Sequence, residues 1–210
     1  MSDKKVLVIN YGLGNLASVM NALEFCDIPA FVSDSKNDLE RASHAILPGV
    51  GAFGQGMHNL QVSGWPDAIR KFALRDEKPF LGICLGMQLL ADNSTEHGFH
   101  EGLSLIPGIV DRLQKHENIR IPHIGWNSVE TENSPKTYSD IDGVEDYYFV
   151  HSYVMKPADE THISGLTHHG SPFVSSVEKD NVWGVQFHPE KSHKPGLQIL
   201  RNFWKSGGEC

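Results

Sequence analysis

The chain has 210 residues, of which 40% are hydrophobic and 21% charged, a balance that argues against an intrinsically disordered protein. Its formal net charge is −8 and no basic cluster extends beyond Lys4 and Lys5, which argues against nucleic-acid binding. The N-terminal apolar run is too short for the core of a signal peptide and no run could span a membrane, so we expect a cytoplasmic protein. No linker, repeat or low-complexity segment interrupts the chain, so residues 1–210 are expected to form one domain.

The first half of the chain alternates between segments typical of strands and segments typical of helices. Apolar runs rich in β-branched residues indicate strands, and stretches with apolar residues at helical spacing separate them. Such βα alternation predicts an α/β fold with a mostly parallel central sheet. The expected order is a strand at 5–9, a helix at 16–25, strands at 30–33 and 44–48, a helical pair over 53–74, a strand at 79–83 and a helix over 87–92.

The second half contains short β-like runs and one closing helix. Strands are expected within 119–126, 146–153, 173–177 and 181–187, and the helix over 195–204. Because these runs are not separated by helical segments, we expect antiparallel strands added to one edge of the parallel sheet.

The first strand is followed by a glycine-rich turn that has the pattern of a nucleotide-binding fingerprint. Gly12-x-Gly14-x-x-Ala17 lies between a strand and a helix, and Asp34 follows the next strand. In a dinucleotide-binding fold the glycines allow a tight turn beside the pyrophosphate, and the acid holds a ribose. Such turns also occur in any doubly wound sheet, so a dinucleotide-binding oxidoreductase is one alternative that the rest of the chain must decide.

Three cysteines are present, and their wide spacing fits neither a disulfide framework nor a CxxC metal motif. Cys84 stands in the sequence Gly-Ile-Cys-Leu-Gly, between an apolar strand and a helical segment. This is the arrangement of a nucleophile elbow with Cys in place of Ser. A helix N-terminus favours the reactive thiolate, and the N–H of Leu85 would point toward the oxygen that becomes negative after attack. The alternative is a buried structural cysteine in a glycine-flanked turn.

A general base for Cys84 is available near the C-terminus. Alternation along 181–187 places Gln186 and His188 on one face, with His188 at the end of the expected strand. Glu190, two residues further on, can accept the second ring N–H of His188 and so fix its tautomer. Cys84, His188 and Glu190 therefore form a candidate catalytic triad.

Five motifs in separate parts of the chain carry a family resemblance. "GICLGMQLL" and "VQFHPEKS" resemble the class I, triad-type glutamine amidotransferases. "LPGVGAFGQGM", "IPHIGWN" and "YYFVHSY" resemble specifically the glutaminase subunits of imidazole glycerol phosphate synthase. The similarity extends over essentially the whole chain. It implies a flavodoxin-like class I glutamine amidotransferase domain. Such a domain hydrolyses glutamine and passes the ammonia to the cyclase subunit of the synthase, for histidine biosynthesis, as a heterodimer that needs no cofactor.

The resemblance implies roles for the triad and for an oxyanion hole. Cys84 would attack the carboxamide carbon, and His188, oriented by Glu190, would protonate the departing ammonia and then activate water against the thioester. The oxyanion would be bound by the N–H of Leu85 and by a second N–H from the "PGVG" loop. The candidates in that loop are Val50 and Gly51, and a loop that misdirects this donor would place the enzyme under control of its partner.

The resemblance also implies a substrate pocket. Gln88 lies one helical turn after Cys84 and can reach the substrate. In the family this Gln and a downstream Glu, here Glu96, bind the amino-acid end of glutamine. His151 and Ser152 of the "FVHSY" motif are expected in the same pocket.

The same family places the Gly12-x-Gly14 turn at the face that docks on the synthase, with no dinucleotide bound. Asn15, Ile124 and Trp126 would line that face, the alternative for Trp126 being a place in the core. No metal site is expected, because the other histidines lack a matching set of ligands. A related glutaminase that feeds a different synthase, for instance one that amidates surface-polysaccharide sugars, stays open as an alternative.

Overall fold

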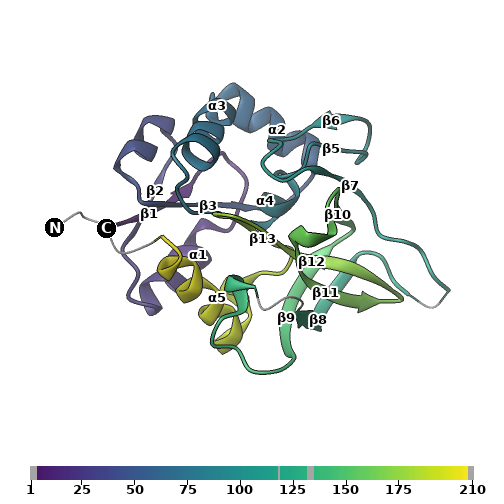
Figure 1. Cartoon of the computed structure of the whole chain (residues 1–210). Helices are drawn as coiled ribbons and strands as arrows, with labels where there is room; N and C mark the ends of the chain where they lie inside the picture. The colour runs from purple at the N-terminus through teal and green to yellow at the C-terminus, as the bar shows by residue number, and fades with distance from the viewer. Residues whose placement is uncertain (1–3, 118, 132–134, 208–210) are drawn as a thin grey trace.

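The central feature of the computed structural model is a nine-stranded mixed sheet (Figure 1). The structure describes residues 4–117, 119–131 and 135–207. The strand order is β2-β1-β3-β4-β13-β12-β11-β8-β9, and the first five of these strands run parallel. The parallel strands are β1 (Val6–Ile9), β2 (Ala30–Ser33), β3 (His44–Gly49), β4 (Phe80–Cys84) and β13 (Val182–Val185).

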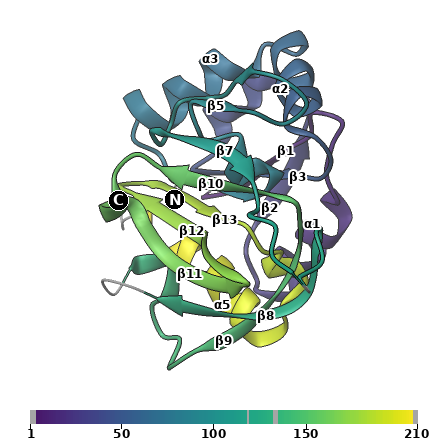
Figure 2. The ribbon, with the colours of Figure 1, turned by 90° about the vertical axis from the view of Figure 1, so that its right-hand side faces the viewer.

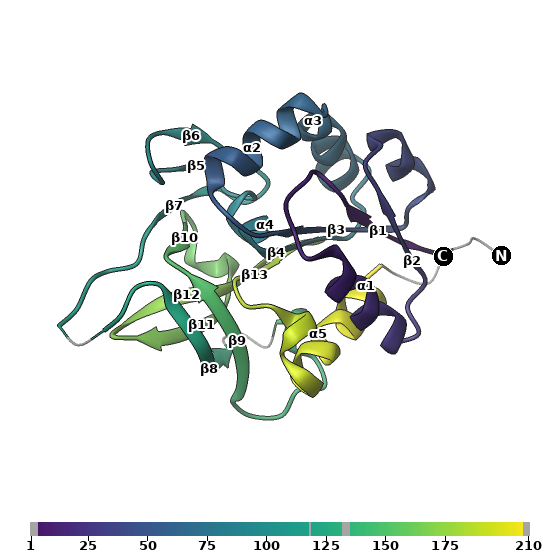
Figure 3. The ribbon, with the colours of Figure 1, turned by 180° about the vertical axis from the view of Figure 1, so that it is seen from behind.

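Helices cover both faces of the parallel strands, as Figures 1 and 3 show. Side chains alternate along β1, so Leu7 and Ile9 pack into the core beneath α2 and α3, while Val6 and Val8 pack into the core with α1 and α5. Burial on both faces explains why these strands read as continuous apolar runs. The helices are α1 (Leu16–Phe25), α2 (Phe53–Val62), α3 (Trp65–Arg70), α4 (Leu85–Gln88) and α5 (His193–Lys205).

Four antiparallel strands extend the sheet at the edge beyond β13, and the sequence predicted antiparallel additions at one edge. The expectation that the run at 181–187 is one of these additions is wrong, because β13 pairs in parallel with β4 and only its other side pairs antiparallel, with β12. The strand over residues 163–169 was not predicted. A separate four-stranded sheet, which the sequence analysis did not predict, has the order β10-β7-β5-β6 and lies beside this edge (Figure 2). The remaining strands are β5 (Asn93–Ser94), β6 (His100–Glu101), β7 (Gly108–Arg112), β8 (His123–Thr131), β9 (Glu145–His151), β10 (Tyr153–Pro157), β11 (Ile163–His169) and β12 (Ser171–Lys179).

The helix expected over 87–92 is wrong, because α4 is a single turn that ends at Gln88. The next carbonyl groups accept hydrogen bonds from the returning chain instead of extending the helix. Leu103 N–H donates to Leu89 O at 2.9 Å, and Leu105 N–H donates to Leu90 O at 2.9 Å. Partners from a distant segment therefore take over the carbonyl groups near the end of the helix.

The expectation that His188 ends a strand is also wrong, because β13 ends at Val185. Gln186 N–H donates to Ser175 O at 2.8 Å and His188 N–H donates to Tyr148 O at 2.9 Å, so the chain leaves β4 and crosses toward β9. The predicted alternation holds through the bend, since Trp183, Val185 and Phe187 share one core.

The helices in the described part of the chain are all too short or too polar to span a membrane.

Candidate active site

Cys84 occupies a sharp turn between β4 and α4, at the carboxyl ends of the parallel strands. Its backbone has φ 55° and ψ −110°, an uncommon conformation for a residue with a side chain. Gly86 is required here, because a Cβ at this position would collide with the carbonyl oxygen of Leu47. Since α4 has only four residues, its macrodipole is small, and the electrostatic support for a thiolate must come mainly from side chains.

His188 and Glu190 form a buried hydrogen-bonded pair next to Cys84. His188 Nδ1 lies 2.8 Å from Glu190 Oε1, and the two side chains are 2% and 1% exposed. Because a carboxylate only accepts, Nδ1 carries the proton, and the buried Nε2 has no hydrogen-bond partner within the described residues. Burial lowers the pKa of His188, but Cys84 and Glu190 outweigh it and raise the pKa to about 9. At neutral pH the ring is therefore an imidazolium beside the sulfur.

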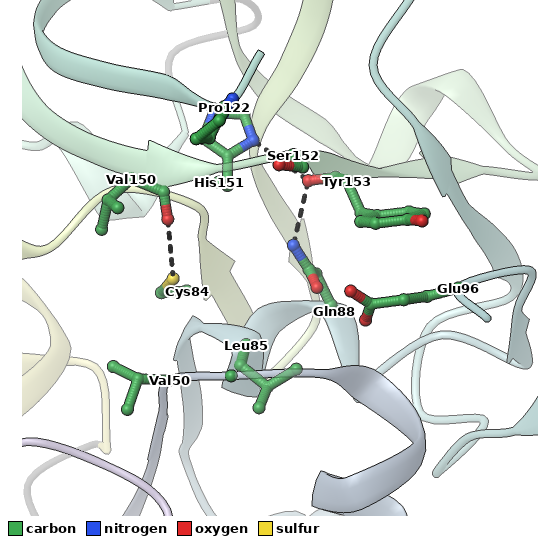
Figure 4. A pocket seen from close by; sticks show the side chains of 11 residues that line it. Val50, Cys84, Leu85, Gln88, Glu96, Pro122, Val150, His151, Ser152 and Tyr153 are labelled. Atoms are coloured by element: carbon green, nitrogen blue, oxygen red, sulfur yellow. Dashed lines mark hydrogen bonds between the residues drawn. The ribbon is translucent and has the colours of Figure 1, made fainter.

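A pocket of about 370 Å³ opens above Cys84 (Figure 4). All seven residues that the sequence analysis placed around the triad line it: Val50, Gly51, Leu85, Gln88, Glu96, His151 and Ser152. Three further lining residues, Pro122, Val150 and Tyr153, were not singled out from the sequence, although two of them flank "HS" in the same motif. Segments that are far apart in the sequence thus meet at one site.

The loop after β3 forms the wall of the pocket next to the nucleophile. Gly49, the last residue of β3, pairs with Cys84 in the parallel register, so Val50 and Gly51 follow directly beside the sulfur. Gly51 has φ 105°, which favours glycine, and no atom would contact a Cβ there within 4 Å. The space beside Gly51 is therefore open, and the Val50 and Leu85 side chains lie below Cys84 in Figure 4.

Gln88 and Glu96 present oxygen atoms to the other end of the pocket. Gln88 Nε2 donates to Tyr153 O at 3.0 Å and to Gln186 Oε1 at 3.0 Å, which uses both of its hydrogens and leaves Oε1 as an acceptor. Glu96 is 9% exposed, and its Oε2 accepts from Phe53 N at 2.6 Å. Figure 4 shows the Glu96 carboxylate beside the Gln88 carboxamide. Two acceptors, one of them a carboxylate, suit an ammonium group.

His151 lines the pocket without being an acid or a base at neutral pH. Its Nδ1 donates to Tyr153 O at 3.0 Å, so its Nε2 accepts from His123 Nδ1, also at 3.0 Å. Burial lowers the pKa of His151 to about 3 and that of His123 to about 4. Both rings therefore stay neutral and hold the Tyr153 carbonyl in place.

The glycine-rich turn after β1 lies beside the same loop. Gly12 and Gly14 have φ 87° and 146°, and a Cβ at Gly14 would lie 3.4 Å from Pro48 O, so the turn packs against the residue that precedes Gly49. Asn15 caps α1 by accepting from Ser18 N at 3.3 Å. The glycines are thus explained by backbone geometry at this turn.

Ile124 and Trp126 lie on β8 with 61% and 47% of their surface exposed. The core alternative for Trp126 is therefore wrong. Its indole stacks on the ring of His193, with centroids 4.9 Å apart and planes 8° from parallel.

The described part of the chain contains no group of three or more His, Cys, Asp or Glu side chains placed to hold a metal ion.

Gln186 is a site residue that the sequence analysis did not select. Its side chain is fully buried, and its Nε2 lies 3.8 Å from Cys84 Sγ. The available signal was its place on the same face as His188 in the alternating run.

Comparisons with known proteins agree with this geometry. The family model for glutamine amidotransferase class-I matches residues 7–206. The chain is 46% identical over 200 residues to imidazole glycerol phosphate synthase subunit HisH of Moorella thermoacetica, covering 95% of this chain and 94% of that protein. It is 43% identical over 198 residues to subunit HisH 2 of the same synthase from Pseudomonas aeruginosa, covering 94% and 98%. A crystal structure of a glutamine amidotransferase shares the fold with a TM-score of 0.75 at 21% identity, covering 97% and 99%. On this evidence, the chain belongs to the class-I glutamine amidotransferases.

Proposed function

We propose that this chain is the glutaminase subunit of imidazole glycerol phosphate synthase, a cytoplasmic enzyme of histidine biosynthesis. It would hydrolyse glutamine to glutamate and ammonia and deliver the ammonia to the cyclase subunit. The proposal rests on one observation: the buried His188–Glu190 pair lies beside Cys84, and Cys84 lines a pocket. The high identity to synthase subunits over nearly the full chain supports the choice of partner.

In the first half of the reaction, the Cys84 thiolate attacks the carboxamide carbon of glutamine. A C–S bond forms as the C=O electrons move onto oxygen, and the backbone N–H of Leu85 with one N–H from Val50 or Gly51 stabilises the oxyanion. The C–N bond then breaks, and His188 transfers the proton on Nε2 to the leaving nitrogen, which departs as ammonia. The product is a glutamyl thioester on Cys84.

In the second half, water replaces ammonia. Neutral His188 takes a proton from water as the oxygen attacks the thioester carbon, and the same donors bind the second oxyanion. The C–S bond breaks, glutamate leaves, and the thiolate–imidazolium pair is restored. Glu190 keeps the ring oriented in both halves by accepting from Nδ1 at 2.8 Å.

The amino-acid end of glutamine would occupy the part of the pocket lined by Gln88 and Glu96. Its ammonium group would donate to Gln88 Oε1 and to the Glu96 carboxylate. Ser152 and the backbone beside it would complete the wall opposite these acceptors.

The cyclase would dock on a face that carries Asn15, Ile124 and Trp126. Ile124 and Trp126 are two large apolar side chains exposed on one strand, and aromatic anchors of this kind are enriched in protein interfaces. Trp126 is ordered by stacking on His193, so little side-chain entropy is lost on docking.

The experiment measures glutamate release by the purified chain alone, then with the cyclase subunit of the same organism, then with that subunit and its ligand. We expect weak turnover alone and strong stimulation by the complete mixture. Turnover that ignores the cyclase would keep the glutaminase assignment and point to a different ammonia-accepting synthase. Absence of glutamate release under all three conditions would reject the proposal.

A further inference from the structure

The buried carboxamide of Gln186 contacts the nucleophile, although none of the reaction steps above uses it. Gln186 directly follows β13, and its backbone N–H donates to Ser175 O at 2.8 Å. Its side chain has no exposed surface. A polar group without access to water must form its hydrogen bonds inside the protein, and the partners of this one are Gln88 and Cys84.

The direction of both carboxamides follows from the carbonyl oxygen of Tyr153. A carbonyl oxygen only accepts, so the Gln88 atom 3.0 Å away is Nε2. The same Nε2 lies 3.0 Å from a terminal atom of Gln186, which must accept and is therefore Oε1. The remaining terminal atom of Gln186 is Nε2, and it lies 3.8 Å from Cys84 Sγ. The backbone carbonyl of Tyr153 thus fixes the orientation of both carboxamides, so that an N–H of Gln186 points at the Cys84 sulfur.

Gln186 and Val150 act on the sulfur in opposite directions. Val150 O lies 3.9 Å from Sγ and can only accept, so this contact favours the protonated thiol (Figure 4). The N–H of Gln186 favours the thiolate, because a donor facing an anion forms a charge-assisted hydrogen bond. The titratable groups on either side are His188, which is cationic at neutral pH, and Tyr11, whose pKa is raised by burial and by the charge of Cys84.

We propose that Gln186 is a positioning residue for the nucleophile, whose N–H, aimed by Gln88, holds the Cys84 sulfur as a thiolate ready to attack. This role rests on the proposed glutaminase function and deepens it. It also connects substrate binding to the nucleophile, because Gln88 faces the pocket and orients Gln186 at the same time. Glutamine that contacts Gln88 Oε1 would therefore strengthen the alignment of the donor.

The test compares the pH dependence of Cys84 alkylation by iodoacetamide, without glutamine, in a parent that carries Cys26→Ser and Cys210→Ser. Cys210 lies outside the described residues. Gln186→Glu keeps the acceptor for Gln88 and replaces the donor with an anion, whereas Gln186→Met removes both groups at similar volume. Gln198→Glu is the matched control, because its carboxamide in α5 donates to Asn202 Oδ1 at 2.9 Å, away from the pocket.

We expect both Gln186 variants to react at least about tenfold more slowly than the parent at neutral pH, about 1.4 kcal/mol, with the profile midpoint moved to higher pH. Gln186→Glu should show the larger move, and Gln198→Glu should match the parent. If the buried carboxylate prevents the Gln186→Glu variant from folding, the comparison of Gln186→Met with the parent tests the proposal by itself. A folded Gln186 variant whose profile coincides with that of the parent would overturn the proposal.

Glutamate release by the parent, measured in parallel with the cyclase subunit, separates the two proposals. If the Gln186 variants show a shifted alkylation profile but the parent releases no glutamate, the role of Gln186 on the sulfur is supported and the glutaminase function is rejected. If the parent releases glutamate but the Gln186 variants have the same alkylation profile as the parent, the glutaminase function is supported and the role of Gln186 is rejected.

Discussion

Nδ1 of His188 and Oε1 of Glu190 lie 2.8 Å apart, and both side chains are almost completely buried. This pair, together with Cys84, sets the protonation of the His188 ring. Burial by itself lowers the pKa of His188, but the neighbouring Cys84 and Glu190 raise it to about 9. The ring therefore enters the reaction already carrying the proton that the departing ammonia needs.

This protonation predicts the alkaline limb of the pH profile. Because the pKa of His188 is raised, the imidazolium prevails below about pH 9 and is lost above it, so kcat/KM for glutamate release should fall as pH rises through about 9. Glu190→Gln removes one of the groups that raise the pKa and should move the limb to lower pH. Steady-state kinetics between pH 6 and 10 measure both profiles, and an unmoved limb in the variant would contradict the role of Glu190.

Cys84→Ala should separate the two activities of the complex. Loss of the nucleophile should reduce glutamate release by about 10⁴-fold or more. Synthesis by the cyclase with added ammonium salt should continue at the wild-type rate, because that reaction does not need the thioester. Cys26→Ala is the control and should retain both activities. Loss of ammonia-dependent synthesis in the Cys84 variant would contradict this division of labour.

Glu96→Gln should weaken substrate binding more than it slows the chemistry. The variant replaces the carboxylate proposed to bind the ammonium of glutamine, a charged hydrogen bond of about 1.5–3 kcal/mol, so KM should rise roughly 10- to 100-fold. Glu101→Gln, an exposed acid on the neighbouring β6, should leave KM unchanged. Glutamate release at varied glutamine concentration gives both constants. A fall in kcat with constant KM would instead assign Glu96 to holding the Phe53 backbone.

Gly51→Ala should reduce turnover while leaving the fold intact. No atom would contact the added Cβ within 4 Å, but φ 105° is unfavourable for alanine, so the loop must change its backbone conformation. Misdirecting one oxyanion donor costs about 10²–10³ in kcat. Gly143→Ala is the matched control, because Gly143 also has a positive φ and open space. Both variants should unfold at similar temperatures, and equal kcat values would argue against a role for this loop.

Trp126→Ala should weaken the complex with the cyclase. An exposed aromatic anchor at the centre of an interface contributes about 2 kcal/mol or more, so Kd should rise roughly 30-fold. Phe25→Ala is the control and should leave Kd unchanged. Phe25 is an aromatic residue that is 70% exposed at the C-terminal end of α1, whereas Asn15 of the proposed docking face lies at the N-terminal end. Isothermal titration with the purified cyclase measures both constants. Equal affinities would move the proposed docking face away from β8.

Local sequence determined the elements and the chemical groups of the site. The periods of apolar residues located α1 and the parallel strands, because each element buries one stripe or two faces of its own side chains. The glycine-flanked Cys84 and the His188-x-Glu190 spacing identified the candidate triad, because a nucleophile elbow and a two-residue spacing are local geometries. The family motifs added the pocket residues.

The tertiary structure decided where elements end and which distant groups meet. The end of α4 at Gln88 depends on hydrogen bonds from residues 103–106, and the second sheet depends on pairing between β7 and β10. The contact between Gln186 and Cys84 joins positions 102 residues apart, and its direction depends on a third segment at Tyr153. Hydrogen-bond partners at such separations leave no periodic trace in the sequence, because each partner is chosen by the packed fold and not by its neighbours along the chain.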